Sequence, residues 1–246
     1  MSPEAPIAGS EPLEIGSLLF DKLDQIDLTG PFEVFGRLPD SRCRLYGLST
    51  TPVRDQAGLQ LTPDAALSEA PQLDVLHIPG GPGQQVLMEN EPVLDWVRSQ
   101  AAGAKIVFSV CTGALICGAA GLLRGRKATT YWTVQHLLPA FGAEPIDARV
   151  VVDRNLVCAA GVTSGIDGAL RVAALLRGQA CAETIQLAMQ YAPDPPFQCG
   201  SPDTAPAAIV DAVRARTANL TASREEATRA AAERLGIKLH GIPAKT

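Results

Sequence analysis

Apolar runs alternate with amphipathic segments along most of the chain, and this alternation predicts strands and helices in turn. The apolar, β-branched runs predict strands at 13–20, 43–49, 73–79, 106–110 and 128–130, a hairpin at 149–159 and a small antiparallel excursion at 51–63. Helical signals follow at 32–35, 91–102, 114–120, 131–138, 166–176, 180–191 and 207–235. The order predicts an α/β fold in which helices cover both faces of a mainly parallel sheet.

The first helix is expected to have Thr29 as its N-cap and Pro31 at its first position. Asp27 would then lie just beyond the end of the first strand, at the sheet edge where open α/β folds build their sites. We expect one domain over residues 13–235, after a flexible N-terminus at 1–12 and before a tail at 236–246. The Pro-rich stretch 192–206 predicts irregular structure.

Composition narrows the class of protein. The chain has 246 residues, 46% of them hydrophobic, and a formal net charge of -5 without a long basic run. These values argue against nucleic acid and anionic membranes as partners. There is no signal-peptide pattern at the N-terminus and no apolar run of the ~18 residues that a membrane-spanning helix needs. A cytoplasmic protein is the expectation.

Six cysteines are present, none in a CxxC pair, and the three histidines do not cluster with them at metal-ligand spacing. The pattern therefore predicts neither a disulfide scaffold nor a metal site. Cys111 differs from the other five because it lies between the clearest strand and the helix that follows it. A helix N-terminus lowers a thiol pKa from about 8.5, which would favour a nucleophile. A buried structural thiol is the alternative, and the residues by themselves leave both open.

Asp27 also has two interpretations, a helix-start residue or an acid beside Cys111. Two neighbouring anions repel, so we expect a neutral carboxylic acid that donates to a thiolate. A histidine partner has little support: His77 lies within an apolar strand, and the position of His136 is undetermined. Arg171 is expected at the surface and Asp203 in a turn.

Gly80-Gly81-Pro82-Gly83 follows the third strand and lacks the Lys-Ser/Thr of a phosphate loop. The backbone N–H groups of Gly80 and Gly81 are instead expected to approach the nucleophile, as donors to a developing negative charge.

Four segments resemble the DJ-1/PfpI superfamily: Asp27-Leu28-Thr29-Gly30-Pro31, Ile78-Pro79-Gly80-Gly81, Val110-Cys111-Thr112-Gly113 and Ala128-Thr129-Thr130-Tyr131-Trp132. The resemblance extends from about Leu13 to Pro206. Within the superfamily the chain is most similar to the bacterial isocyanide hydratases. That narrower match depends on Asp rather than Glu at position 27, on Cys111-Thr112, and on the Pro-rich stretch 191–206.

The resemblance implies a flavodoxin-like fold, a homodimer, and hydration of an isocyanide to an N-substituted formamide through a cysteine thioimidate. It implies Cys111 as the nucleophile, Asp27 as the acid and base, and the Thr112 backbone as part of the site. Residues expected to bind the substrate are Gly80, Gly81, Tyr131 and Trp132. No metal or organic cofactor is expected.

The chain departs from its relatives at two positions. Tyr131 stands where they commonly have His, so no histidine role is carried over. Ala160 stands in a stretch that is often all glycine, which bears on the mobility of the following helix.

Two alternatives stay open. Glyoxalase- or deglycase-like enzymes use a similar cysteine, and some AraC-type regulators carry this fold as a ligand-sensing domain. Such a regulator needs two helix-turn-helix motifs, roughly 100 residues, whereas about 40 follow Pro206. We expect the helix at 207–235 to pack on the domain or on a partner subunit.

Overall fold

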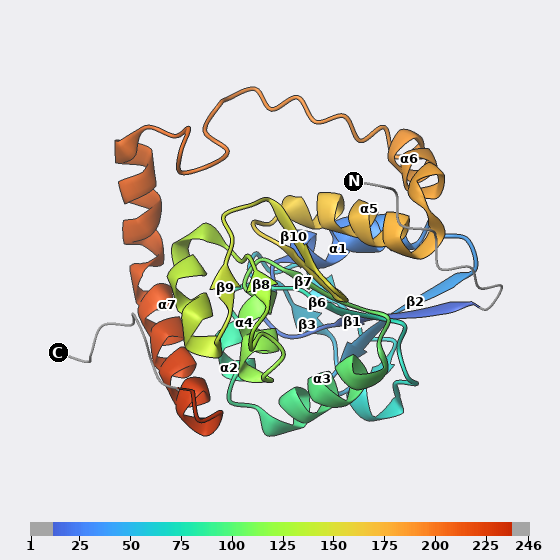
Figure 1. The fold of residues 1–246 in the computed structure, drawn as a ribbon, viewed down its shortest axis with the longest axis horizontal. Coiled ribbons are helices and arrows are strands. Elements are labelled where there is room, and N and C mark those ends of the chain that lie inside the picture. Colours follow the sequence, from blue (N-terminus) through green and yellow to red (C-terminus); the bar gives the residue numbers. More distant parts are fainter. Residues whose placement is uncertain (1–11, 238–246) are drawn as a thin grey trace.

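The structure is a computed structural model that describes residues 12–237. A seven-stranded sheet forms the centre of the molecule (Figure 1). The strand order is β10-β11-β7-β6-β1-β2-β5, and every neighbouring pair is parallel except β10 and β11. The strands are β1 (Leu13–Leu18), β2 (Ser41–Gly47), β5 (Ala65–Ala66), β6 (Val75–Ile78), β7 (Ile106–Val110), β10 (Val150–Asp153) and β11 (Leu156–Ala159). The predicted mainly parallel α/β sheet is confirmed, and so is the hairpin.

Two short ribbons accompany this sheet. The first pairs β3 (Val53–Arg54) with β4 (Gln60–Leu61) antiparallel, which confirms the predicted excursion. The second pairs β8 (Lys127–Ala128) with β9 (Glu144–Pro145) in parallel.

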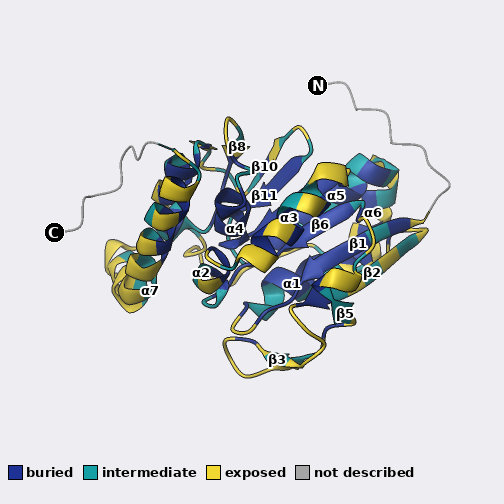
Figure 2. Ribbon diagram, turned by 90° about the horizontal axis from the view of Figure 1, so that it is seen from below, coloured by how far each residue is buried: buried dark blue, intermediate teal, exposed yellow. Residues whose placement is uncertain are grey.

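Helices cover both faces of the sheet, as the alternation predicted (Figures 1 and 2). One face carries α1 (Gln25–Phe35) and α5 (Ser164–Arg177), with α6 (Gln179–Ala188) packed on α5. The other carries α2 (Gln84–Leu87), α3 (Glu91–Gly103), α4 (Gly113–Ala119), the 3-10 helices η1 (Leu67–Glu69) and η2 (Trp132–Phe141), and α7 (Ala207–Arg234).

Strand β7, in the interior of the sheet, lies between two apolar cores. Its residues are all buried, and Ile106, Phe108 and Val110 belong to the core under α1 and α5. Val107 belongs to the core under α3 and α4. Because successive strand side chains point to opposite faces, a continuous apolar run is what a strand covered on both sides requires.

The predicted start of the first helix is wrong. Helix α1 begins at Gln25, where the Asp24 side chain accepts a hydrogen bond from the Ile26 N–H at 3.1 Å and so caps the helix. Thr29 Oγ1 donates instead to the Gln25 carbonyl at 2.9 Å, and Pro31 lies inside the helix. Asp27 is therefore in the first turn of α1 rather than in the loop before it.

The segment predicted as a helix at 131–138 is the 3-10 helix η2, which contains Pro139 and ends before Gly142 at a φ of 72°. The Pro-rich stretch 192–206 has neither helix nor strand, as predicted. The predicted N-terminus at 1–12 and tail at 236–246 lie almost entirely outside the described residues. Within residues 12–237, no helix is both long and apolar enough to cross a membrane.

Helix α7 has 28 residues, about 42 Å at 1.5 Å per residue, and only its second half is buried against the domain. Its first half is largely exposed and rises beside the domain in Figure 1, after the long connection from α6. The buried positions all lie after residue 223, namely Arg224, Ala227, Thr228, Ala231 and Ala232. The prediction that this segment packs on the domain is confirmed for that half.

Candidate active site

The carboxyl ends of three adjacent parallel strands, β1, β6 and β7, meet at one edge of the sheet. Cys111 follows β7 directly, Gly80 and Gly81 follow β6, and Asp27 lies in α1 after β1. The topology therefore brings Cys111 together with residues that lie 30 to 84 positions before it in the chain, at the edge where open α/β sheets build their sites.

Cys111 occupies a sharp turn between β7 and α4. Its φ is 55°, in the left-handed region that costs a residue with a Cβ some strain. Two backbone bonds hold it there: its N–H donates to the Ala159 carbonyl at 2.9 Å, and its carbonyl accepts from Thr130 Oγ1 at 2.7 Å. Only 6% of the residue is exposed. The turn keeps the thiol at the N-terminal end of α4, as the strand-helix pattern predicted.

Asp27 is fully buried beside this thiol. Its Oδ2 accepts a hydrogen bond from the Gly80 N–H at 3.0 Å. Its Oδ1 has no hydrogen-bond partner among the described residues, and the Cys111 thiol lies near enough to lower the pKa of the carboxyl. One carboxyl oxygen is thus fixed by backbone, and the other is left for the thiol or for a bound molecule.

Gly80 and Gly81 connect the two side chains through their backbone. The Gly81 N–H donates to Thr112 Oγ1 at 3.0 Å, while the Gly80 N–H holds Asp27. Both N–H groups are engaged by site side chains in this structure, whereas the sequence predicted that they approach the nucleophile as donors to a developing negative charge. Their observed contribution is to fix the distance between the turn at Cys111 and α1.

Burial dominates the electrostatics of the pair. Burial, and to a smaller extent the charge of Asp24, raises the pKa of Asp27 to about 8. The Gly80 N–H and the Cys111 thiol lower this pKa, but by less. The carboxyl is therefore mostly protonated at neutral pH, as expected. Burial and the Asp27 charge also raise the pKa of Cys111 well above its ordinary value, although the Thr112 N–H opposes this. The predicted lowering of the thiol pKa is wrong, because the Thr112 N–H at the start of α4 does not outweigh the burial of the thiol.

Tyr131 and Trp132 lie at the start of η2 with their ring centroids 6.0 Å apart. Tyr131 packs against both apolar cores, and its pKa is raised by burial first and by Cys111 second. Trp132 stacks under the Arg214 guanidinium of α7, 5.6 Å from the ring centre. The structure brings Tyr131 close to the thiol, and it turns Trp132 toward α7.

Arg224, in the second half of α7, is the site residue that sequence reasoning missed. It is 4% exposed; its Nη2 donates to the Gly81 carbonyl and its Nε to Gln84 Oε1, both at 3.0 Å. A signal was present in the pattern of small residues at 227, 228, 231 and 232, which puts position 224 on the same buried stripe of the helix.

Neither histidine forms a hydrogen bond with Cys111 within the described residues. His77 is fully buried, with Nδ1 2.9 Å from Ser17 Oγ, and burial lowers its pKa to about 3, so the ring is neutral as part of the core. His136 lies at the surface, with Nε2 3.2 Å from Glu225 Oε1 of α7. No group of three or more potential metal-ligating side chains occurs in residues 12–237.

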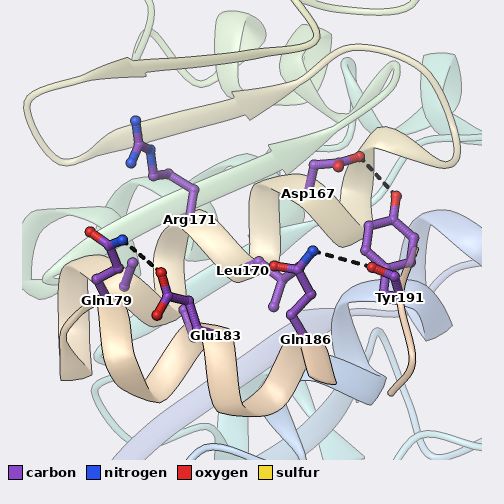
Figure 3. A pocket seen from close by; sticks show the side chains of 9 residues that line it. Asp167, Leu170, Arg171, Gln179, Glu183, Gln186 and Tyr191 are labelled. Atoms are coloured by element: carbon purple, nitrogen blue, oxygen red, sulfur yellow. Dashed lines mark hydrogen bonds between the residues drawn. The ribbon is translucent and has the colours of Figure 1, made fainter. Parts of the chain in front are cut away.

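An open groove of about 390 Å³ lies between α5 and α6 (Figure 3). Tyr191 closes one end with a 3.1 Å hydrogen bond to Asp167, and the exposed Arg171 lies along it, a surface cation as predicted. None of the predicted site residues lines this groove, which is formed by Asp167, Leu170, Arg171, Ala174, Gln179, Ala182, Glu183, Gln186 and Tyr191.

A buried cysteine in a strained strand-to-helix turn, beside a protonated carboxyl at the edge of a parallel sheet, defines an α/β protein of the cysteine nucleophile-elbow class. The model of the DJ-1/PfpI family matches residues 15–175. The chain belongs to the DJ-1/PfpI family.

Individual relatives differ in how much of the chain they match. The isonitrile hydratase of Pseudomonas putida is 50% identical over 92% of this chain and 99% of its own length. A glutathione-independent glyoxalase of Caenorhabditis elegans is 28% identical over 54% of this chain and 72% of its own length. The crystal structure of a ThiJ/PfpI family protein from Pseudomonas syringae superposes with a TM-score of 0.86 and 39% identity, over 92% of this chain and 98% of that one.

Proposed function

We propose that this protein is an isocyanide hydratase, which adds water to an isocyanide to give an N-substituted formamide. The observation that carries the proposal is the 50% identity to the Pseudomonas putida isonitrile hydratase over nearly the full length of both chains. The geometry supports it, because a buried thiol and a protonated carboxyl suit a substrate carbon that accepts a nucleophile and a proton at one atom.

The first step is addition of the Cys111 thiol to the isocyanide carbon. A C–S bond forms, and the lone pair of that carbon takes a proton from Asp27, which regains one from the thiol. One S–H bond is lost and one C–H bond is made, so the product is a neutral thioimidate with a carbon-nitrogen double bond. The thiol ionises only as it reacts, which agrees with its raised pKa.

Hydrolysis of the thioimidate completes the cycle. Water adds to the thioimidate carbon. Asp27 takes a proton from the water and gives its carboxyl proton to the nitrogen. The tetrahedral adduct then collapses: the C–S bond breaks, the hydroxyl proton passes through Asp27 to sulfur, and the formamide leaves. Neither step requires a metal or an organic cofactor.

The other predicted residues orient these groups. Thr112 contributes the N–H that opposes the rise in the thiol pKa, and Gly80 holds Asp27. Tyr131, beside Cys111, and Trp132 are proposed to contact the organic substituent of the isocyanide. The homodimer and the cytoplasmic location stay predictions that come with the family resemblance and the composition.

The test is turnover of cyclohexyl isocyanide by Cys111→Ala. The variant should form no N-cyclohexylformamide, whereas Cys199→Ala, which removes an exposed thiol, should match the parent protein. In the parent, mass spectrometry under single-turnover conditions should find the Cys111 peptide heavier by one substrate. Appreciable formamide from Cys111→Ala would reject the mechanism.

Glyoxalase chemistry is the second candidate, and the Caenorhabditis elegans relative is the observation that favours it. Methylglyoxal offered in the same assay, with Cys111→Ser as the comparison, separates the two activities. A ligand-sensing role has less support, because the described residues after Pro206 form one continuous helix rather than a helix-turn-helix pair.

A further inference from the structure

Arg224 is a buried cation without an ion pair to a carboxylate in the part of the chain that the structure describes. Burying an unpaired guanidinium is costly, and among residues 12–237 the hydrogen bonds that compensate for it go to two neutral oxygens, of Gly81 and Gln84. Other arginines of α7 avoid this cost: Arg234 pairs with Glu91 and Arg229 with Glu225. The burial of Arg224 without a carboxylate partner therefore indicates a role other than stabilising the fold.

The ionisable groups that face Arg224 are those of the candidate active site. Burial lowers the pKa of Arg224, and three groups oppose this by favouring its charged form. They are Cys111 in the turn after β7, Tyr131 at the start of η2 and Asp27 in α1. Asp24 at the start of α1 acts on the same Cys111 and Asp27 with the opposite sign. In the resting site the carboxyl is mostly protonated at neutral pH and the thiol is neutral, so the guanidinium has no formed anion beside it. It would gain one when the thiol ionises.

The same side chain holds the backbone on which the pair depends. Its bond to the Gly81 carbonyl fixes a turn whose two N–H groups bind Asp27 and Thr112. This contact comes from 143 residues along the chain, beyond the stretch that the family model matches. The docking of α7 thus adds to the site a residue from outside the stretch that the family model matches.

We propose that Arg224 is a positioning residue of the active site, which holds the Gly81 turn and supplies the positive charge that stabilises the Cys111 thiolate as it forms. The proposal rests on Cys111 being the reactive thiol of the proposed function. It assigns to α7 a direct part in the reactivity of the cysteine in the turn after β7.

The experiment compares three variants by the rate at which iodoacetamide alkylates Cys111 near neutral pH, followed on the Cys111 peptide. Arg224→Gln keeps a donor for the Gly81 carbonyl and loses the charge, so the rate should fall about tenfold, the effect of one pKa unit. Arg224→Lys keeps the charge and should alkylate within about twofold of the parent. Arg234→Gln is the matched control and should leave the rate unchanged, because Arg234 lies on the same helix and, like Arg224, donates to backbone of the domain, in its case the Met88 and Ala119 carbonyls.

Turnover of cyclohexyl isocyanide provides the second readout. Arg224→Gln should lower kcat with little change in KM, because a neutral substrate does not need the charge in order to bind. Arg224→Lys should recover kcat only in part, since an ammonium does not reproduce the fork that spans Gly81 and Gln84. Circular dichroism verifies that each variant is folded.

The outcomes separate this proposal from the proposed function. Parent-like alkylation of folded Arg224→Gln, or a tenfold slower rate in Arg224→Lys, would overturn the role of the charge even if isocyanide is hydrated. If alkylation follows the charge at position 224 while the parent hydrates no isocyanide, the proposed function fails and the assignment of Arg224 stands.

Discussion

Gly80 has no room for a side chain, because the site is built against its backbone. A Cβ at this position would lie 2.6 Å from the Thr112 nitrogen and Oγ1, and 2.9 Å from Asp27 Oδ2. The glycine therefore allows the turn after β6 to approach both partners. Cys111 shows the complementary case: a residue with a Cβ in the left-handed region, held there by bonds to Ala159 and Thr130.

Gly80→Ala should destabilise the protein and displace Asp27. The added methyl group must push Thr112 or the carboxyl aside, and overpacking of this kind costs about 1–3 kcal/mol in free energy of unfolding. Urea titration measures that cost, and isocyanide turnover should fall with it. Gly200→Ala is the control, because a Cβ there meets nothing within 4 Å, so a change under about 0.5 kcal/mol is expected. Equal stability of the two variants would contradict the packing at Gly80.

At the scale of elements, α7 divides into a largely exposed first half and a docked second half. The docked half buries small side chains against η2, α2 and α4, and small residues let the helix approach closely. The sequence predicted this helix within one residue at each end, but the helix is polar on most faces after Arg214, so the small residues at 227, 228, 231 and 232 were a weak signal of the buried face. Only the position of the neighbouring helices selects the stripe that carries Arg224.

Ala231→Leu tests the docking of α7. Ala231 is fully buried, so three additional carbons have no space, and the free energy of unfolding should fall by about 1–3 kcal/mol. Ala215→Leu makes the same change on the exposed half of the same helix and should alter stability by less than about 0.5 kcal/mol. Thermal or urea unfolding compares them, and a tolerated leucine at 231 would mean that α7 does not pack as described.

At the scale of the whole molecule, two buried groups make stability depend on pH in opposite directions. Burial lowers the pKa of His77 from 6.5 to about 3, so the unfolded chain binds the extra proton between these values and stability rises with pH. Burial raises the pKa of Asp27 from 3.8 to about 8, so the folded protein holds the extra proton and stability falls as pH rises across that window. Above pH 6.5 the contribution of His77 no longer changes with pH, so of these two groups only Asp27 lowers the stability as pH rises.

Asp27→Asn should remove the fall in stability that the parent shows as pH rises, because the amide does not ionise. Between pH 6.5 and about 8 the variant should gain about 2 kcal/mol relative to the parent, the value of 1.5 pKa units. Urea unfolding at several pH values measures the difference. Asp203→Asn, the same change at an exposed residue, should follow the parent at every pH. A constant difference between parent and Asp27→Asn would show that Asp27 is not buried as a neutral acid.

The sequence alone determined the alternation of strands and helices, the elbow at Cys111 and the candidacy of Asp27, because contiguous residues carry these signals. The tertiary structure decided what depends on distant neighbours. Asp24 rather than Thr29 caps the start of α1, and burial outweighs the Thr112 N–H in setting the pKa of the Cys111 thiol. Arg224 reaches Gly81 across 143 residues. Burial and long-range contact are properties of the folded chain, and no local pattern contains them.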